Sequence, residues 1–273
     1  MKKIVYQGTK ASYSEIAIDR FFGKEIEPIG KSSFKEVFQS LENEEATFAA
    51  IPIENSLIGP IIENFDLFQS YEVSIMGELS LPIEHCLVGK KGQKIEEIKK
   101  VLSHSKALKQ CSGFFQAHPW IEPVVHFDTA GAAKEISEQN DPRLAAIGSR
   151  KTATVYSLEV LKDHLEDDCS NQTRFLFLQK KECSSWTLNQ GKCSLLFTLN
   201  HVSGSLSEIL LILAIHGLNL TQIVSRPIRE KPFEYLFFAD ILFSKNNQFE
   251  TILQTIKEKT QTLKLLGIYE PSK

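Results

Sequence analysis

The segment Asn171-Gln172-Thr173-Arg174-Phe175 places a hydroxyl group and a guanidinium directly before an apolar stretch. An Arg at the entrance of a strand is most often a solvated surface residue. This one is of interest because only six of the 31 Lys and Arg residues are Arg, and because a hydroxyl stands beside it. A guanidinium binds a carboxylate through two parallel hydrogen bonds, while a Thr hydroxyl can donate to a neighbouring oxygen. The pair therefore suits a site for a carboxylate that lies next to another oxygen.

Two other segments place polar groups at the ends of expected strands. Asn55-Ser56 follows Ile51-Pro52-Ile53, and Asp128-Thr129-Ala130 follows another apolar run. Ligands of open α/β sheets bind beyond the carboxyl ends of the strands, where these residues are expected. Small residues after Asp128 would also let an anion approach the N-terminus of a helix. Helix capping explains the same residue types in both segments, so both interpretations stay open.

Composition and spacing argue against several classes of function. The seven His and five Cys form no metal-ligand motif, so no metal is expected, and Gly89-Lys90-Lys91-Gly92 lacks the frame of a phosphate-binding loop. A net charge of −3 argues against a nucleic-acid partner. The chain shows neither a signal segment nor an apolar run of about 20 residues, which predicts a cytoplasmic protein with no membrane partner.

Two capping boxes mark elements that must position these groups. Ser12-Tyr13-Ser14-Glu15 and Ser33-Phe34-Lys35-Glu36 each precede a helical pattern. Strands are expected at Ile4–Tyr6 and Thr47–Ile53, the second as a buried parallel strand. The alternation predicts a doubly wound α/β domain with helices on both faces of its sheet.

The same alternation continues through a second unit. The extended stretch Val73–Val88 is long enough to cross from one lobe into the next. Beyond it the pattern predicts a helix at Ile95–Leu102, a strand at Val124–Phe127, a helix at Thr129–Ser137 and a strand at Leu144–Ile147. A strand at Phe175–Leu178 would carry the chain back to the first lobe.

The last part of the chain has a pattern of its own. The polar stretch Lys180–Lys192 predicts a linker. Strand, helix, strand, strand and helix are then expected at Ser194–Leu199, Leu206–His216, Asn219–Ser225, Tyr235–Phe243 and Phe249–Leu263. A final strand near Leu266 would complete a ferredoxin-like βαββαβ module. No nucleophile stands beside a general-base His there, so ligand sensing suits the module better than catalysis.

Several motifs in the same order resemble those of the prephenate dehydratase family, with its C-terminal ACT regulatory domain. In the first two units they are Tyr6-Gln7-Gly8 to Tyr13-Ser14-Glu15, Ile51 to Ser56, Ser103-His104 through Gln110-Cys111, Asp128 to Ala133, Ala146 to Ser149, and Asn171 to Phe175. In the last module they are Gly204-Ser205-Leu206, Ser225-Arg226-Pro227 and Leu266-Gly267-Ile268-Tyr269. Each motif is weak alone, but the set in register is specific and spans nearly the whole chain.

The resemblance implies an α/β fold in which a two-lobed, periplasmic-binding-protein-like catalytic domain precedes a ferredoxin-like βαββαβ ACT domain. The catalytic domain would span residues 1–180, with lobe 1 at about 1–76 plus 170–180 and lobe 2 at about 77–169. The ACT domain would span residues 194–273.

The resemblance also implies a reaction and the residues that carry it. Prephenate has two carboxylates and a ring hydroxyl, and it loses CO2 and water to give phenylpyruvate in L-phenylalanine biosynthesis. Formation of the aromatic ring drives the step, so no cofactor is expected. By this resemblance Thr173 donates a hydrogen bond to the departing hydroxyl and Arg174 anchors a carboxylate. The other residues expected at the catalytic centre are Asn55, Ser103 and Gln110. The expected substrate-binding residues are Ser12, Ser14, Ser56, Thr129, Ala130, Ser149 and Phe175.

For the last module, the resemblance implies feedback inhibition by L-phenylalanine at a module interface, and hence a homodimer or homotetramer. The expected effector-site residues are Gly204, Ser205, Leu206, Asn219, Leu220, Ser225, Arg226 and Pro227. The chain departs from the family pattern at Ser203 and Val224, which replace the usual Pro and Glu. Loss of the Glu could alter which amino acid binds. Departures in the catalytic motifs are Thr9, Ala11 and Ser105.

Two alternatives stay open on these motifs. Arogenate dehydratase acts on a substrate with an amino group where prephenate has a ketone, and it shares the same residues. A non-catalytic two-lobed amino-acid sensor with an ACT module would bind a ligand without turnover.

Overall fold

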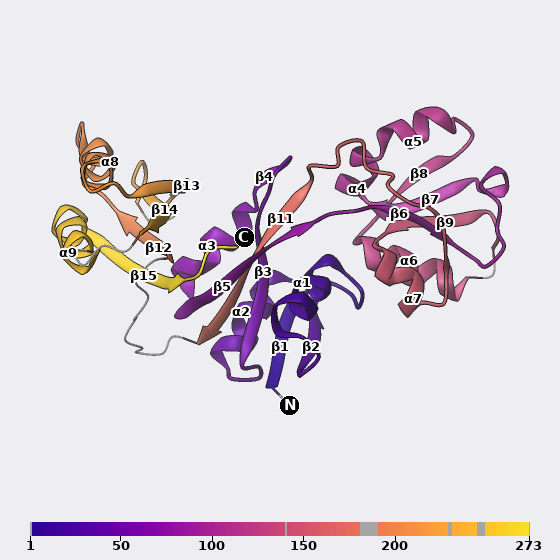
Figure 1. Cartoon of the computed structure of the whole chain (residues 1–273), viewed down its shortest axis with the longest axis horizontal. Helices are drawn as coiled ribbons and strands as arrows, with labels where there is room; N and C mark the ends of the chain where they lie inside the picture. The colour runs from indigo at the N-terminus through magenta and orange to yellow at the C-terminus, as the bar shows by residue number, and fades with distance from the viewer. Residues whose placement is uncertain (1, 140, 181–190, 229–230, 245–248, 273) are drawn as a thin grey trace.

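The computed structural model describes residues 2–139, 141–180, 191–228, 231–244 and 249–272, and it arranges the chain as three units in a row (Figure 1). Each unit is built on one sheet. We call the central unit lobe 1, the unit that follows it in the chain lobe 2, and the third unit the C-terminal module. The mixed sheets of the lobes and the antiparallel sheet of the module confirm the predicted fold class. Most of the expected linker Lys180–Lys192 lies outside the described residues.

Lobe 1 has the sheet order β2-β1-β3-β11-β5, with β4 beside β3. Its elements are β1 (Lys2–Gln7), α1 (Tyr13–Phe22), β2 (Ile26–Lys31), α2 (Phe34–Glu42), β3 (Phe48–Asn55), β4 (Gly59–Pro60), α3 (Ile62–Ser70), β5 (Val73–Pro82) and β11 (Gln172–Lys180). β1 pairs in parallel with β2 and β3, as the alternation predicts, whereas β11 runs antiparallel to both β3 and β5. The last strand of the two-lobed part therefore returns to lobe 1, as expected.

The two predicted capping boxes form differently. The Ser33 hydroxyl accepts a hydrogen bond from the Glu36 backbone N–H and caps α2. Ser12 stands at the N-cap of α1, but its hydroxyl makes no capping bond. Instead the Glu15 carboxylate accepts from the Ala11 N–H at 2.7 Å. The Ser12 hydroxyl is thereby left for the pocket described below.

Lobe 2 has the sheet order β10-β6-β9-β7-β8. Its elements are β6 (Cys86–Gly89), the 3-10 turn η1 (Ile95–Glu97), β7 (Lys100–His104), α4 (Ser105–Gln110), α5 (Ser112–Ala117), β8 (Glu122–His126), α6 (Thr129–Glu138), β9 (Leu144–Gly148), α7 (Arg150–Val155) and β10 (Glu159–Lys162). The chain crosses from lobe 1 through β5 to β6, as predicted for Val73–Val88 (Figure 1).

The helix predicted at Ile95–Leu102 is wrong. A single 3-10 turn stands there, followed by β7, which pairs in parallel with both β8 and β9. Val101 and Leu102 are both buried, one on each face of this central strand. Their spacing from Ile95 and Ile98 fits one face of a helix, but a strand buried on both faces can carry the same apolar residues.

The C-terminal module has the sheet order β13-β14-β12-β15, and its neighbouring strands are antiparallel. Its elements are β12 (Gly191–Thr198), α8 (Ser205–Ile215), β13 (Asn219–Pro227), β14 (Tyr235–Phe243), α9 (Phe249–Lys259) and β15 (Thr262–Tyr269). This is the predicted βαββαβ order. The last helix ends earlier than expected, because the final strand begins at Thr262.

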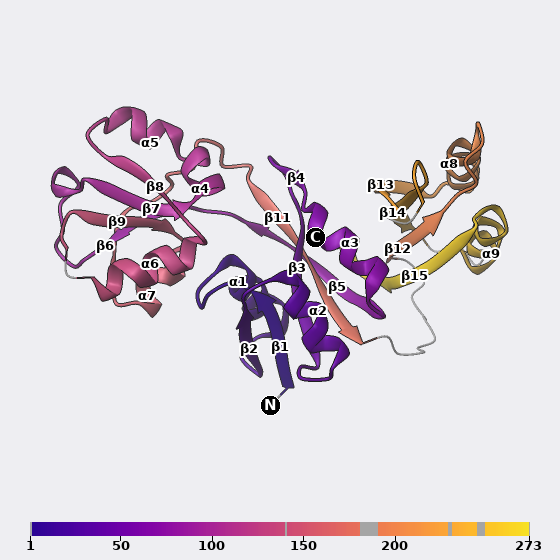
Figure 2. The same cartoon turned by 180° about the vertical axis from the view of Figure 1, so that it is seen from behind.

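One face of the module's sheet packs on its own helices, and the other packs on lobe 1. The rings of Phe65 in α3 and Phe238 in β14 meet edge to face, with centroids 4.9 Å apart. Gly267 in β15 lies so close to β5 that a Cβ there would stand 2.2 Å from the Ile75 carbonyl oxygen. Both views place the module beside lobe 1 and away from lobe 2 (Figures 1 and 2). Lobe 1 and the module thus share a core.

Within the described ranges, no helix combines the length and apolar character that crossing a membrane requires.

Candidate active site

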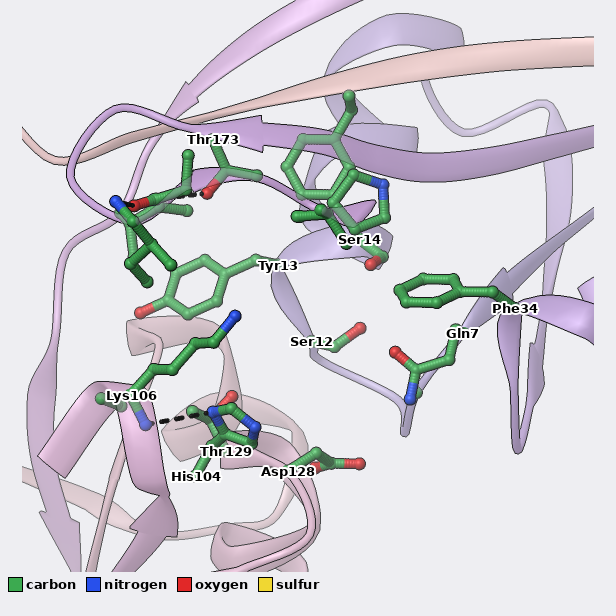
Figure 3. Close-up of a pocket in the computed structure, with 18 of the residues that line it drawn as sticks. Gln7, Ser12, Tyr13, Ser14, Phe34, His104, Lys106, Asp128, Thr129 and Thr173 are labelled. Atoms are coloured by element: carbon green, nitrogen blue, oxygen red, sulfur yellow. Dashed lines mark hydrogen bonds between the residues drawn. The ribbon is translucent and has the colours of Figure 1, made fainter. Parts of the chain in front are cut away.

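A pocket of about 530 Å³ lies between the two lobes, where the carboxyl ends of β1, β3, β7 and β8 face one another. Its volume is in the range of small-molecule sites. Lobe 1 contributes Ser12, Tyr13, Ser14, Asn55, Thr173 and Phe175 among others, and lobe 2 contributes His104, Lys106, Gln110, Asp128 and Thr129. Figure 3 shows side chains from both lobes converging on this space.

The Thr173 hydroxyl is held in place by Asn55. The two residues occupy paired positions of β11 and β3. Asn55 Nδ2 donates to Asn171 Oδ1 at 2.7 Å, and to Thr173 Oγ1 and the Gln172 carbonyl oxygen, both at 3.0 Å. Asn55 Oδ1 accepts from the backbone N–H groups of Leu57 and Ile58, at 3.1 and 3.0 Å. Because backbone N–H groups can only donate, this fixes which end of the amide faces Thr173.

This arrangement leaves a proton for a ligand. The Thr173 hydroxyl accepts from Asn55 and donates to no partner in the described part of the chain. Its O–H can therefore point into the pocket toward an oxygen of a bound molecule. Thr173 and Asn55 are 9% and 7% exposed, so little water competes for the bond. Such a preorganised donor stabilises charge that develops on a departing oxygen.

A second wall of the pocket is hydrogen-bonded and uncharged. The Tyr13 hydroxyl donates to the Glu84 carbonyl at 2.6 Å and lies 2.9 Å from His85 Nδ1. His85 Nε2 lies 3.0 Å from Gln110 Oε1. Burial lowers the pKa of His85, so its ring is neutral at neutral pH. Tyr13 of lobe 1 and Gln110 of lobe 2 are thereby linked through the segment that joins the lobes.

The helix N-terminus considered as an anion site is already capped. Asp128 Oδ1 accepts from the Gly131 N–H, and Asp128 Oδ2 accepts from the Thr9 hydroxyl at 2.7 Å across the cleft. The capping interpretation is therefore the one that holds, although Thr129 lines the pocket beside the helix N-terminus.

Among the described residues, no group of three or more His, Cys, Asp or Glu side chains is placed to hold a metal ion.

Direct contacts join the lobes on one side of the pocket. Lys151 of α7 pairs with Glu15 and Asp19 of α1, with N–O distances of 2.7 and 2.6 Å. The Ser149 hydroxyl donates to the Ala11 carbonyl at 3.0 Å. These bonds set the distance between the two walls that a ligand would touch.

Ser12 offers a second free polar group. Its hydroxyl is buried, lines the pocket and has no hydrogen-bond partner in the described chain. Buried polar groups are nearly always paired, so an orphaned hydroxyl facing a cavity is expected to bind a ligand or water there.

The structure brings only part of the predicted set to the pocket. The predicted residues that line it are Thr173, Asn55, Gln110, Ser12, Ser14, Thr129 and Phe175. Their individual roles stay predictions. The predicted residues that do not line it are Ser103, Arg174, Ser56, Ala130 and Ser149.

Ser103, Ser56 and Ala130 have structural positions instead. The Ser103 hydroxyl donates to the Ile147 carbonyl at 2.8 Å and joins β7 to β9. The Ser56 hydroxyl accepts from the Gln172 N–H at 2.9 Å and ties the turn after β3 to β11. Ala130 is fully buried in the first turn of α6. Asn55 accepts from backbone N–H groups of the turn after β3 and does not cap α3, whose N-cap is Ile61. The helix-capping interpretation of Asn55 is therefore wrong.

Arg174 lies on the face of β11 opposite Thr173, because successive side chains of a strand alternate. Its guanidinium is 2.9 Å from Glu78 and 2.7 Å from Asp240 of the C-terminal module, and Lys192 lies 2.6 Å from Glu78. We call Glu78, Arg174, Lys192 and Asp240 the ionic cluster; each side chain is 11% exposed or less. The carboxylate-anchor role predicted for Arg174 does not fit this position, since its charge is already paired with protein carboxylates outside the pocket.

Some pocket residues were missed by the sequence analysis. Tyr13, His85 and Lys106 were not singled out, although all three line the pocket. Lys106 stands four residues before Gln110, and this spacing on α4 places both side chains on one face of the helix. That spacing was the signal that could have identified Lys106.

A smaller pocket of about 140 Å³ lies in the C-terminal module. The predicted effector residues Ser205 and Leu206 line it. Gly204 precedes them as the N-cap of α8 with a φ of 90°, a left-handed conformation that favours Gly.

The remaining predicted effector residues lie on β13 and do not all converge. Ser225 to Pro227 pair with Phe237 to Tyr235 of β14. Of these β14 residues, Tyr235 and Phe237 line the smaller pocket. Asn219 and Leu220 lie at the opposite end of the strand. Arg226 binds Asp66 of α3 through two hydrogen bonds of 2.7 and 2.9 Å, so it joins the module to lobe 1.

Comparison with known proteins agrees with this geometry. A family model described as prephenate dehydratase matches residues 4–183. The chain is 35% identical to the chloroplastic arogenate dehydratase/prephenate dehydratase 2 of Arabidopsis thaliana, over 98% of this chain and 72% of that protein. Among solved structures it resembles GqqA, described as a novel type of quorum-quenching acylase, with a TM-score of 0.91, 26% identity and coverage of 99% and 98% of the two chains. It also resembles prephenate dehydratase from Arthrobacter aurescens in complex with L-Phe, with a TM-score of 0.89, 26% identity and coverage of 98% and 89%. Because the family model spans well over half of its length, this chain belongs to the prephenate dehydratase family.

Proposed function

We propose that this chain converts prephenate into phenylpyruvate, CO2 and water in the biosynthesis of L-phenylalanine. The observation that carries the proposal is the Thr173 hydroxyl, which Asn55 holds at the wall of an interlobe pocket with its proton free. Membership of the family supports the same reaction.

The reaction needs positioning and one well-placed donor. The bond between the ring and its carboxylate breaks, the electron pair enters the ring, and the ring loses its hydroxyl. The departing hydroxyl takes up one proton and leaves as water. Thr173 stabilises it by a hydrogen bond, and the proton comes from solvent because a Thr hydroxyl is a weak acid. Phe34, Ile61, Ile83 and Phe175 offer apolar surface to the ring in the same pocket.

The test is turnover by the purified full chain. Prephenate is supplied at neutral pH, and phenylpyruvate formation is followed by absorbance against the spontaneous rate. We expect saturable formation far above that rate. Binding of prephenate without turnover would contradict the proposal and favour the two-lobed sensor.

Arogenate dehydratase is a second candidate, since a relative at 35% identity carries both activities in its name. The two substrates differ only in the ketone or amino group of the side chain. Direct competition on one enzyme preparation gives the ratio of the two kcat/KM values. We expect the ratio to favour prephenate.

Acylase activity is less consistent with the pocket, despite the similarity to GqqA. Acyl transfer commonly uses a hydroxyl or thiol activated by a neighbouring base. In the described pocket, no Ser or Thr hydroxyl is hydrogen-bonded to a His. Incubation with an N-acyl homoserine lactone serves as the control and should show no release of the acyl group.

The proposal extends to feedback inhibition by L-phenylalanine through the C-terminal module, as the complex of the Arthrobacter relative with L-Phe supports. Deleting the module would expose Phe65 and leave Arg174 without Asp240, so a point variant is the sharper test. L-phenylalanine should raise KM or lower kcat in the full chain. Ser205→Ala should weaken the response, and Thr251→Ala on the exposed face of α9 is the control. An equal response in both variants would contradict this assignment.

A homodimer or homotetramer is the assembly we propose. α8 exposes Leu210, Leu211 and Ile215, which are 37%, 58% and 71% exposed. Apolar side chains clustered on one exposed helix face commonly mark an interface. Light scattering should give at least twice the chain mass, and Leu211→Glu should reduce it. A monomeric mass for the unaltered chain would contradict the assembly.

A cytoplasmic location stays a prediction from the sequence.

A further inference from the structure

Lys106 stands out in the pocket because its charge is unpaired. Among the described residues that line the pocket, it is the one Lys or Arg. Its ammonium makes no hydrogen bond or ion pair within the described chain, whereas Lys151 and Lys192 each contact carboxylates. In Figure 3 the side chain reaches into the pocket beside the ring of Tyr13.

The local structure directs this side chain inward. Lys106 and Gln110 stand four residues apart on α4 and both line the pocket, whereas Lys109 of the same helix does not. The backbone N–H of Lys106 donates to His104 Nδ1. Burial, together with the charge of Lys106, lowers the pKa of His104, so the neighbouring ring is neutral and adds no second cation.

The other charges of the pocket make a cation there more important. Glu63 and Asp128 line the same space. Asp128 is already engaged by Thr9 and Gly131, but its charge remains, and so does that of Glu63. A substrate with two carboxylates must therefore enter a pocket in which Lys106 supplies the positive charge.

We propose that Lys106 binds the side-chain carboxylate of the substrate and selects the keto substrate over its amino counterpart. This inference rests on the proposed function. The ring carboxylate is the poorer partner, because a cation bound to it would hold back the electron pair that must enter the ring. A contact with the side-chain carboxylate is made equally in the bound substrate and in the transition state, so it lowers KM and leaves kcat nearly unchanged.

The same contact discriminates between the two substrates. The ketone of prephenate stands next to the side-chain carboxylate, and in arogenate an ammonium replaces it. An ammonium beside Lys106 places two positive charges close together, and like charges in a binding site weaken association. Lys106 therefore favours prephenate.

The test compares Lys106→Met with Lys106→Arg and with Lys109→Met, the matched control on the same helix. Lys106 is exposed, so its hydrogen bond to a carboxylate contributes less to binding than a fully buried one would. We therefore expect Lys106→Met to raise the KM for prephenate about tenfold with kcat within about twofold. Its preference for prephenate over arogenate should fall by a similar factor. Lys106→Arg should keep both values, and Lys109→Met should match the unaltered protein.

Salt gives a readout that a purely structural role would not move. Added salt screens an exposed charge, so the KM of the unaltered protein should rise with ionic strength more steeply than that of Lys106→Met. Turnover with the same KM, salt slope and substrate ratio in both proteins would overturn this inference alone. Absence of turnover of either substrate by the unaltered protein would overturn the proposed function, and this inference with it.

Discussion

Thr173 and Arg174 are neighbours in the chain, yet they serve two different regions of the molecule. Thr173 faces the pocket between the lobes, and Arg174 faces the ionic cluster under the C-terminal module. In the pocket, Ser12 Oγ and the Lys106 ammonium lack partners in the described chain. In the ionic cluster, each charge has an opposite charge within 2.9 Å. The Ser12 hydroxyl and the Lys106 ammonium are thus available to a ligand in the pocket, whereas the paired charges of the ionic cluster fix the C-terminal module against lobe 1.

The largest effect on stability is expected from Arg174→Met. This change leaves Glu78 and Asp240 with Lys192 as the one remaining cation of the cluster. Removing one partner from a buried ion pair costs about 3–5 kcal/mol, because the other charge stays buried. We expect a loss of that size in the free energy of unfolding, measured in urea, with the KM of the folded protein for prephenate nearly unchanged.

The matched control is Arg226→Met, which breaks the more exposed pair with Asp66 at the same interface. Exposed pairs contribute about 0–1 kcal/mol, so its loss should be much smaller. A tenfold rise in KM for Arg174→Met at unchanged stability would reverse the comparison. It would restore Arg174 as the carboxylate anchor.

A smaller effect is expected from Gly267→Ala, which acts on the contact between the module and lobe 1. The added Cβ would meet the Ile75 carbonyl oxygen of β5, so β15 must move away. Overpacking of this kind costs about 1–3 kcal/mol. Thermal unfolding should occur at lower temperature, while kcat for prephenate stays within about twofold. A strong loss of kcat at unchanged stability would show that the pocket depends on this contact more than we propose.

The smallest effect is that of acid on stability, and as the pH falls His85 at the pocket should respond before Glu78 of the ionic cluster. Burial lowers the pKa of His85 below its ordinary value of 6.5, so the folded protein holds the neutral ring while the unfolded chain binds a proton more readily. The stability contributed by His85 is therefore complete above about pH 6.5 and is lost as the pH falls below it, by at most about 1.4 kcal/mol per pH unit.

Glu78 of the ionic cluster should respond at lower pH. Burial alone would raise the pKa of Glu78, but its hydrogen bond to Lys192 and the charges of Lys192 and Arg174 lower it overall. Its contribution is present above the ordinary value of 4.5 and is lost as the pH falls through the lowered one. Unfolding free energies measured from pH 8 to pH 3 should show both steps, and His85→Gln should flatten the first one only. A first step that persists unchanged in His85→Gln would contradict this assignment.

Much of the fold could be predicted because periodicity and caps are local signals. The β-α alternation, the crossing at Val73–Val88, the return strand and the βαββαβ module all follow from such patterns. The helix predicted at Ile95–Leu102 failed because an apolar spacing that fits a helix also fits a central strand buried on both faces. Which of the two forms depends on neighbours that are distant in the sequence.

The candidate site was predicted less completely. Thr173 and Asn55 were placed together by motif, and the structure joins them by a hydrogen bond. Treating Thr173 and Arg174 as one site overlooked the alternation of side chains along a strand, which puts neighbours on opposite faces. The contact of Arg174 with Asp240 depends on how the module packs against lobe 1, and no local pattern carries that information.

The central claim is that the Thr173 hydroxyl donates to the departing oxygen of prephenate. It is tested most directly by kcat for phenylpyruvate formation at saturating prephenate in Thr173→Val, beside the unaltered protein and Thr173→Ser. Loss of one preorganised donor should lower kcat about 10²–10³-fold in Thr173→Val, with little change in unfolding temperature, whereas Thr173→Ser keeps a hydroxyl and most of the rate. A folded Thr173→Val protein that turns over prephenate at the unaltered rate would contradict the account.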